Sequence, residues 1–402
     1  MNPLQPDTAA IMQLESRVLA QTFQRQPVVW EQGQGCRLVD REGKTYLDFF
    51  SGHAVMNLGY GHPEQLAAMR AQLERLAHSG NLYYLEPQIR LANLLVRHSF
   101  GERVFFANSG AEIVELAVKL ARKWGRKNGA QKYEIICLEG SFHGRTFAAL
   151  TATGQPKYHE GLEPMLPGFK HVPANDLEKI KAATSAATSA VLVEPIQGEG
   201  GIRPLDMEYL RGLRAWCDER KLLLIFDEIQ CGLGRIGHFH AYEHFGVTPD
   251  VLLLGKPLGG GLPLSALVTR TDVAAAMKTG DHGTTFGGNP VAAAGGCVLL
   301  EQLAKPGWLV NVRQAGQYLG EQLDQVAREF PALVAAHRGA GLMHGLELKK
   351  PGAEAVRLAL AAGLVVNCTA VNVLRFLPAL IVSQAEIEEA VSILRRVLAQ
   401  LG

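Results

Sequence analysis

The stretch LLLIFDEIQ at residues 222–230 is the clearest indication of the fold, because an unbroken apolar run leads directly into Asp227 and Glu228 and is closely followed by Gln230. A second stretch, VLLLGKPLGGG at residues 251–261, repeats the pattern and places Lys256 after its apolar run. Short continuous apolar runs are typical of strands that are buried on both faces of a parallel sheet. Ligands of such sheets bind beyond the carboxyl ends of the strands, so both ends are candidate sites for chemistry.

Similar apolar runs recur between helix-length segments on either side of these stretches. They lie at residues 104–107, 134–138 and 190–193, and amphipathic helical patterns occupy residues 111–127 and 207–220. Strands that alternate with helices predict an α/β fold in which helices cover both faces of a mostly parallel sheet. We therefore expect a large domain at residues 61–294.

The two ends of the chain predict a smaller α+β domain, made of residues 1–60 and 295–402. The N-terminal part shows a helical pattern at 9–21 and strand-like segments at 28–30, 36–39 and 45–48. The C-terminal part shows a helical pattern at 298–330 with a break near Pro306, strand-like segments at 341–348 and 374–377, and helical patterns at 353–362 and 384–401. The change of pattern after about residue 295 marks the expected boundary.

The bulk composition argues against several classes of partner. The chain has 402 residues and a formal net charge of +1, so neither nucleic acid nor an anionic membrane is expected as a partner on electrostatic grounds. No apolar run approaches the roughly 20 residues that a membrane-spanning helix needs, and no signal-peptide pattern is present. The six cysteines include no CxxC pair, which argues against a zinc ribbon or a disulfide scaffold. We expect a cytoplasmic protein.

The lysine and the aspartate at the two strand ends have chemically useful surroundings. Lys256 is followed by a run of glycines, and partial desolvation there lowers the pKa of the amine and frees its lone pair for imine formation. Asp227 can keep a pyridinium nitrogen protonated, because a nearby carboxylate favours the charged form of the ring. Taken alone, each residue also has an ordinary explanation, as a surface lysine in a turn and as a solvated loop carboxylate.

A third strand end offers an anion site. The apolar run that ends at Ala107 is followed by Ser109, Gly110 and Ala111 at the start of a helical pattern. A serine can cap the helix, and the first backbone N–H groups together with the helix dipole attract a phosphate. An N-cap of this kind is common, but a strand followed by SGA at a helix start is the arrangement that a phosphate cradle requires.

Longer motifs make the resemblance to a known family specific. From about residue 20 to the C-terminus, the chain resembles the class III, or ω-amino-acid, branch of the fold-type I aminotransferases, which use pyridoxal 5′-phosphate (PLP). The motifs are FFANSGAEIVELAVKLAR, GSFHGRT, EPIQGEGGI, LLIFDEIQCGLGRIG, EHFGVTPDVLLLGKPLGGGLPLSAL, HGTTFGGNP and VLRFLPALIV, in the family's order. Within the branch, SGNLYYLEPQ resembles the acetylornithine aminotransferases.

Carried over position by position, the resemblance implies a PLP site. Lys256 forms the imine with the cofactor and later moves a proton, while Asp227 pairs with the pyridinium nitrogen. Phe142 stacks on the ring, and Gln230 lies near the phenolic oxygen. The phosphate is held by Ser109, Gly110 and Ala111, joined by Thr285 from a partner subunit.

The resemblance also implies a substrate site that serves two kinds of ligand. Arg145 receives a substrate carboxylate, and Arg375 receives the α-carboxylate of glutamate or 2-oxoglutarate. Glu199 pairs with Arg375 when the ω-amino substrate is bound, and the freed arginine can bind a second carboxylate bidentately. Two further substrate-side residues are Thr284, which reaches across a dimer, and Tyr83, which is otherwise an interface or core aromatic.

We therefore expect a homodimeric aminotransferase that works by a ping-pong mechanism and shares its active sites between subunits. It moves the ω-amino group of N2-acetylornithine to 2-oxoglutarate and gives a semialdehyde and glutamate, as in arginine biosynthesis. Succinylornithine, ornithine and 4-aminobutyrate remain alternative donors. A decarboxylase, racemase or aminomutase on the same scaffold would share Lys256 and Asp227, because the cofactor supplies the electron sink.

Two other motifs favour different classes of protein. HAYEH at residues 240–244 fits H-x-x-E-H, which on a helix would place His240 and His244 on one face as zinc ligands of a hydrolase. GAGLMHG at residues 339–345 has glycines spaced somewhat like those of a dinucleotide enzyme, but it resembles a strand itself. Both are weaker alternatives, and we expect no metal site.

Overall fold

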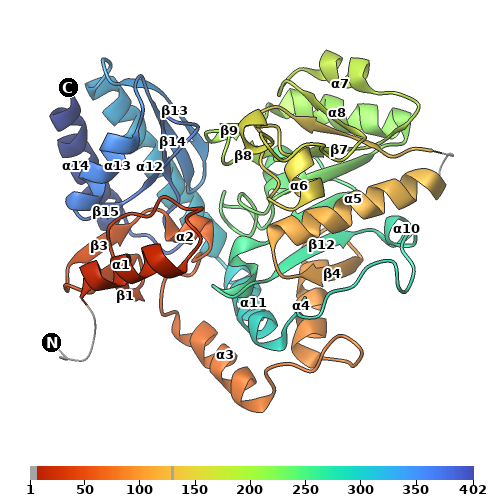
Figure 1. Cartoon of the computed structure of the whole chain (residues 1–402), viewed down its shortest axis with the longest axis horizontal. Helices are drawn as coiled ribbons and strands as arrows, with labels where there is room; N and C mark the ends of the chain where they lie inside the picture. The colour runs from red at the N-terminus through yellow and green to blue at the C-terminus, as the bar shows by residue number, and fades with distance from the viewer. Residues whose placement is uncertain (1–6, 128–130) are drawn as a thin grey trace.

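A seven-stranded sheet forms the core of the part at the right of Figure 1 in the computed structural model, which describes residues 7–127 and 131–402. In the order β4-β12-β11-β10-β7-β5-β6, its strands are Arg103–Ala107, Ser265–Thr269, Val251–Leu254, Leu223–Asp227, Thr188–Val193, Glu134–Leu138 and Phe169–Val172. The neighbours from β11 to β6 pair in parallel, whereas β12 is antiparallel to both β11 and β4. The prediction of a mostly parallel central sheet is confirmed.

The sheet is buried on both faces, as its continuous apolar runs predict. In β10, Leu223 and Ile225 belong to one apolar cluster, whereas Leu224 and Phe226 belong to another. Successive side chains of a strand point to opposite faces, so the two clusters are the two covered sides of the sheet. Helix α5 (Gly110–Lys127) lies against β4, β7, β11 and β12, and α8 (Met207–Arg220) packs on β10. Both helices match their predicted patterns closely.

Shorter elements complete this part of the chain. They are α3 (Pro63–Arg75), α4 (Glu86–Arg97), α6 (Phe147–Ala152), η1 (Pro156–Tyr158), α7 (Leu177–Ala183), β8 (Ile196–Gln197), β9 (Arg203–Pro204), α9 (Ala241–Phe245), η2 (Lys256–Gly259), α10 (Thr271–Ala274) and α11 (Pro290–Leu303). Helix α11 contacts α3, α4 and η2. The turn that contains Lys256 is therefore backed by a buried helix.

Elements from the two ends of the chain share one sheet. The sheet β1-β2-β3-β15 combines Trp30–Gln34, Arg37–Asp40, Thr45–Asp48 and Leu364–Val365, and a second sheet, β13-β14-β17-β16, combines Val334–Ala340, Met343–Leu348, Val373–Phe376 and Asn367–Thr369. The helices are α1 (Thr8–Val18), α2 (Ser51–Ala54), α12 (Trp308–Glu329), α13 (Ala353–Ala361) and α14 (Gln384–Leu401). In Figure 1 the red N-terminal elements accordingly lie beside the blue C-terminal ones. The domain boundaries stay predictions, and residues 1–6 of the first segment lie outside the described residues.

The structure adds detail that the sequence-based prediction did not contain. Strands β6 and β12 were not predicted. The helical pattern at 298–330 forms two helices, α11 and α12, on either side of the expected break, because Pro306 cannot continue a helix and Gly307 turns with φ +83°. Helix α11 begins at Pro290, so the predicted boundary between residues 294 and 295 falls inside it. The segment 339–345 spans the β13–β14 hairpin and opens no helix, which removes the dinucleotide alternative.

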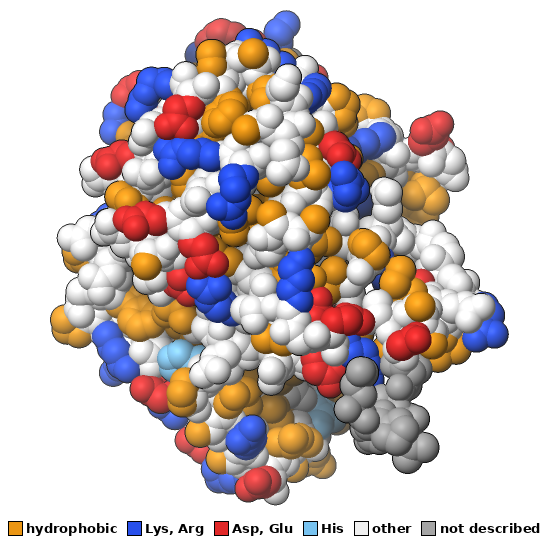
Figure 2. All heavy atoms as spheres, turned by 90° about the vertical axis from the view of Figure 1, so that its left-hand side faces the viewer, with side chains coloured by type: hydrophobic (Ala, Val, Ile, Leu, Met, Phe, Trp, Pro, Cys, Tyr) orange, Lys and Arg blue, Asp and Glu red, His pale blue; other side chains and the backbone are white. Residues whose placement is uncertain are grey.

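Figure 2 shows the face formed by the elements at the left of Figure 1, where basic and acidic side chains are interspersed. Arg37 pairs with Glu389, and Arg395 pairs with Glu329, so several of these charges are neutralised locally. Within residues 7–127 and 131–402, no helix is long and apolar enough to span a bilayer.

Candidate active site

Neighbouring strands bring the two principal candidates, Asp227 and Lys256, to the same edge of the sheet. Asp227 is the last residue of β10 and lies opposite Leu253 of the parallel strand β11. Lys256 follows three residues after Leu253 as the first residue of η2, with φ +45°. Because parallel strands end at the same edge, the carboxylate and the amine share one crevice. The sequence predicts that Asp227 and Lys256 lie at the ends of two strands, and the structure places both residues at this edge of the sheet.

The carboxylate of Asp227 is buried and held on both of its oxygens. The Nδ1 atom of His143 lies 2.8 Å from Oδ2, and the backbone N–H of Ile229 donates to Oδ1 at 3.1 Å. Because an ionised carboxylate only accepts, the Nδ1 atom of His143 carries the proton in this bond. His143 is buried too, and its Nε2 atom has no hydrogen-bond partner among the described residues.

The amine of Lys256 is half-buried among charges. Burial lowers its pKa from the ordinary value, and the positive charge of Arg375 acts in the same direction. The carboxylates of Glu199 and Asp227 oppose this lowering. A lowered pKa favours the unprotonated amine, which is the form that attacks a carbonyl.

The predicted phosphate cradle lies at the N-terminus of α5. Ser109 caps the helix, because its Oγ accepts the backbone N–H of Glu112 at 3.2 Å, and α5 begins at Gly110. The carbonyl of Ser109 accepts a hydrogen bond from Ser265 at 2.8 Å, which ties the cap to β12. A Cβ atom on Gly110 would come within 3.0 Å of Ile229, so glycine keeps this turn close to the Asp227 loop.

The predicted ring-stacking residue, Phe142, follows β5 in a loop beside the same edge. Its backbone N–H donates to Glu194 at 2.8 Å, and its ring lies 5.9 Å from that of Tyr158. The guanidinium of Arg145 lies over the ring of Tyr158, 3.8 Å from the centroid, and 5.4 Å from the centroid of Phe142. Arg145 is exposed, so its charge is open to a substrate carboxylate.

A buried arginine, Arg375 of β17, faces the lysine side of the site. Its Nη1 atom lies 2.5 Å from Glu199 and donates to Gln230 at 3.1 Å, while its Nε donates to Asn367 at 3.0 Å. The Nη2 atom is buried and has no hydrogen-bond partner in the described part of the chain. The arginine therefore has donor capacity left over, which a ligand carboxylate can use.

The pair with Arg375 decides the charge of Glu199. Burial alone would raise the pKa of this carboxyl, but the positive charge of Arg375 and its hydrogen bond lower it to about 2. Glu199 is therefore ionised throughout the neutral range. Gln230 lies beside the same guanidinium, and the predicted contact of Gln230 with a phenolic oxygen stays a prediction.

Three predicted residues lie apart from the Asp227–Lys256 crevice. Thr284 accepts a hydrogen bond from Asn108 at 3.2 Å, at the foot of the phosphate cradle of its own chain. Thr285 is exposed, and 73% of the Tyr83 surface is exposed. A cleft of about 1030 Å³ runs between β4, α5 and the segment that carries both threonines. Thr285 and Tyr83 thus face outward, and both threonines line this cleft.

Sequence reasoning missed three residues of this network: His143, Glu194 and Asn367. His143 and Glu194 stand inside the motifs GSFHGRT and EPIQGEGGI. Glu194 directly follows β7, as Asp227 ends β10, so an acid at a buried strand end is the signal that could have found it. Asn367 carries no such signal, because it is brought to Arg375 only by the β16–β17 pairing.

The residues at this edge fit PLP. A Cβ atom on Gly144 would lie 2.7 Å from the Cβ of Ala111, so glycine leaves open the space between the Phe142 loop and the cradle. The donor set matches the parts of the cofactor: backbone N–H groups of α5 for phosphate, a buried carboxylate for a ring nitrogen, an aromatic ring for stacking and an amine for the aldehyde.

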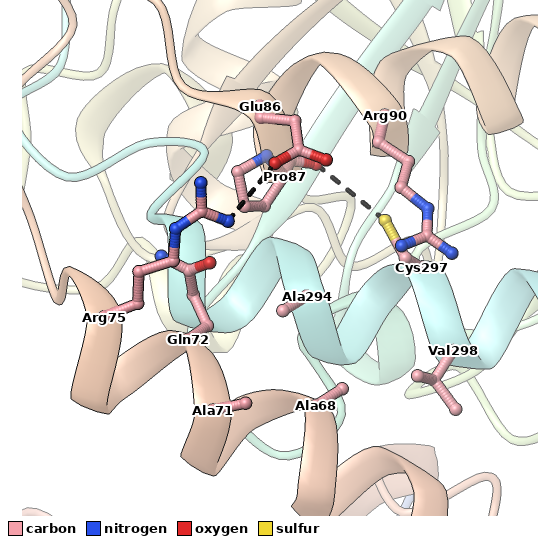
Figure 3. Close-up of a pocket in the computed structure, with 10 residues that line it drawn as sticks. All are labelled: Ala68, Ala71, Gln72, Arg75, Glu86, Pro87, Arg90, Ala294, Cys297 and Val298. Carbon is pink, nitrogen blue, oxygen red and sulfur yellow. Dashed lines mark hydrogen bonds and ion pairs between the residues drawn. The ribbon is translucent and has the colours of Figure 1, made fainter.

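The two other candidate places do not gather such groups. The pocket in Figure 3, about 240 Å³, lies between α3, α4 and α11, where Arg75 pairs with Glu86 at 3.4 Å and the Cys297 thiol lies 3.8 Å from the Pro87 carbonyl. In the H-x-x-E-H segment, His240 precedes α9 and is not on one helix face with His244. Over the described ranges, no three histidine, cysteine or acidic side chains are arranged to hold a metal ion.

Comparison with known proteins agrees with this geometry. A family model described as Aminotransferase class-III matches residues 19–398. The chain belongs to the class-III aminotransferases. An acetylornithine aminotransferase from Caldanaerobacter subterraneus subsp. tengcongensis is 48% identical over 389 residues, which cover 96% of this chain and 98% of the relative. The expectations for the family and for PLP as the cofactor are confirmed.

Solved structures of other aminotransferases have the same fold as this chain. An ornithine aminotransferase from Toxoplasma gondii superimposes with a TM-score of 0.95 at 30% identity, covering 99% of this chain and 96% of that one. An N-acetylornithine aminotransferase from Stenotrophomonas maltophilia superimposes with a TM-score of 0.83 at 35% identity, covering 97% and 99%. The expected fold-type I architecture is confirmed.

Proposed function

We propose that this class-III aminotransferase moves the ω-amino group of N2-acetylornithine to 2-oxoglutarate and gives the semialdehyde and glutamate. The observation that carries the proposal is the Arg375–Glu199 pair at 2.5 Å, placed where its charges act on the amine of Lys256. Relatives between 41% and 48% identical carry the name acetylornithine aminotransferase, which supports this donor over the other ω-amines.

In the proposed reaction, Lys256 binds the cofactor and moves the proton. Bound PLP supplies an aldehyde carbon that exchanges amines and a ring that accepts electrons. The lowered pKa of Lys256 favours a free lone pair on Nζ, which can take a proton from the carbon that bears the amino group and return it later. Asp227 keeps a negative charge beside the ring nitrogen, and His143 orients that carboxylate.

The Arg375–Glu199 pair accounts for the use of two substrates in turn. With the ion pair closed, the arginine is neutralised and the slot accepts the uncharged part of an acylated amine donor. A dicarboxylate such as 2-oxoglutarate competes with Glu199 for the guanidinium, whose Nη2 atom is already without a partner among the described residues. Arg145 lies exposed beside Phe142 and is the proposed partner of the other substrate carboxylate.

The proposed active unit is a homodimer in which Thr285 and Thr284 complete the partner's site. Large apolar side chains support this surface as an interface, because Leu82 and Tyr84 are 94% and 96% exposed in the single chain. The cleft of about 1030 Å³ beside them is lined by both threonines and is large enough to admit part of a second chain. We place the enzyme in the cytoplasm and in arginine biosynthesis.

The test compares amino donors at a fixed 2-oxoglutarate concentration by the glutamate formed. The proposal expects N2-acetylornithine to have a higher kcat/KM than ornithine, succinylornithine and 4-aminobutyrate. A higher kcat/KM for one of the other three would replace the donor and leave the reaction class in place. Loss of glutamate formation with every donor, in protein that has bound PLP, would refute the reaction itself.

A further inference from the structure

A buried carboxylate next to the site, that of Glu194, has no role in the mechanism above. It follows β7 directly, and only 6% of the residue is exposed. One oxygen accepts the backbone N–H of Phe142 at 2.8 Å, and the other accepts the backbone N–H of Gly198 at 3.0 Å. Each oxygen therefore holds a different loop.

The two loops form two different walls of the active site. The first carries Phe142, the proposed stacking ring, and His143, which bonds Asp227. The second carries Gly198 and then Glu199, the partner of Arg375. A single side chain thus joins the wall that faces the cofactor to the wall that faces the substrate carboxylate.

We propose that Glu194 is a positioning residue that holds the Phe142–His143 loop and the Glu199 loop in fixed relation. Only the kinetic part of this inference rests on the proposed function, because the two hydrogen bonds of Glu194 are present whatever the substrate is. Burial raises the pKa of Glu194 to about 7, with the charge of His143 lowering it and that of Asp227 raising it. The two backbone N–H donors oppose this rise, because both hydrogen bonds favour the ionised carboxylate.

Glu228 provides a matched control. It is buried to the same degree, and its two oxygens also accept two backbone N–H groups, from Ala241 at 2.5 Å and Tyr242 at 2.7 Å. Those groups begin α9, which carries none of the residues that form the two walls. Replacing Glu228 with glutamine therefore has a similar local cost and leaves the contacts of the two loops intact.

Hydrogen exchange tests the holding role without reference to activity. We expect Glu194→Ala to speed amide exchange at both Phe142 and Gly198, roughly five- to a hundredfold, because each loses its acceptor. Glu194→Gln keeps one carbonyl oxygen as an acceptor, so exchange should become faster at one or both of these amides. Glu228→Gln should speed exchange only at the start of α9. Unchanged exchange at both amides in folded Glu194→Ala would overturn the inference, whether or not the donor is N2-acetylornithine.

A spectroscopic and kinetic measurement separates positioning from general support of the fold. In the PLP-loaded enzyme, Glu194→Gln should weaken the visible circular dichroism of the bound cofactor and raise the KM for 2-oxoglutarate together. Glu228→Gln should change neither beyond its effect on thermal stability. If both variants lower the melting temperature and neither changes the dichroism or the KM, Glu194 is structural only and the proposal fails.

Discussion

The Nδ1 atom of His143 lies 2.8 Å from Oδ2 of Asp227, and both residues are almost completely buried. A charge-assisted hydrogen bond in such surroundings is stronger than the same bond in water. It fixes the orientation of the carboxylate that is proposed to face the ring nitrogen. His143 therefore acts on the reaction through Asp227.

We expect His143→Ala to lower kcat by about 10- to 100-fold, because loss of a hydrogen bond to a charged group costs about 1.5–3 kcal/mol. His143→Asn places an amide N–H near the position of Nδ1 and should recover part of the loss. Steady-state kinetics with saturating substrates measures both. Equal kcat values for the wild type and the alanine variant would contradict a positioning role for this histidine.

Replacement of Glu199 should shift the balance between the two substrates. Glu199→Gln removes the negative charge from Arg375, so the KM for 2-oxoglutarate should fall by roughly tenfold, equivalent to about 1.4 kcal/mol. The KM for N2-acetylornithine should rise, because the unpaired guanidinium then faces the uncharged part of the donor. Measurement of each half-reaction separately tests this. Parallel changes in both KM values would argue against the ion pair as a switch.

The pH dependence of the Glu199–Arg375 pair has a defined sign. The folded pKa of Glu199 lies at about 2, below its ordinary value of 4.5. The pair therefore stabilises the fold fully above about pH 4.5, and its contribution is lost as the pH falls toward 2. We expect the stability difference between the wild type and Glu199→Gln to be constant from pH 6 to 8 and to shrink on acidification, measured by denaturant unfolding. A difference that changes between pH 6 and 8 would contradict the assigned pKa.

Lys256 should destabilise the cofactor-free protein near neutral pH. Its folded pKa is lowered, so the unfolded chain binds the proton more tightly than the folded one. This cost is present below the folded pKa and fades as the pH rises toward the ordinary value of 10.5. We expect Lys256→Met to raise the melting temperature of the cofactor-free protein at pH 7 and to do so less at pH 10. A variant that melts lower at pH 7 would show that the ammonium is stabilised by Glu199 and Asp227.

Shared active sites can be tested by mixing two inactive variants. Lys256→Ala removes the amine of its own site, and Thr285→Ala removes a contact proposed for the partner's site. If the sites are shared, mixed dimers of the two variants combine both defects in one site and leave the other complete. Refolding the variants together should then restore part of the activity that neither has alone. No recovery, although mixed dimers form, would place Thr285 in the site of its own chain.

The parts of the fold that could be predicted from sequence are those with a local signal. The run at 222–226 predicts a buried strand because every residue in it is apolar, and the edge of the sheet then places Asp227 and Lys256. Strand β12 was missed because its five residues follow a glycine-rich turn and pair antiparallel with β4 and β11, which a local pattern does not reveal. The break near Pro306 between α11 and α12 was predictable, because proline and glycine interrupt a helix locally.

The site shows the same division between local and long-range information. Ser109 and Gly110 were recognised because a cap and a helix start lie next to each other in the chain. The His143–Asp227 bond joins residues 84 positions apart, and the Arg375–Asn367 contact depends on strand pairing. Partners of this kind follow from the register of the sheets and from packing, so only the structure could supply them.

Lys256 and Asp227 are proposed to form the PLP site of an enzyme that takes the amino group of N2-acetylornithine. The most direct test follows the visible absorbance of the PLP-loaded protein on addition of N2-acetylornithine alone, and then of 2-oxoglutarate. We expect the donor to convert the cofactor band, 2-oxoglutarate to restore it, and Lys256→Ala to abolish the cycle. A band that ignores N2-acetylornithine, or a Lys256→Ala protein that completes the cycle at the wild-type rate, would contradict this proposal.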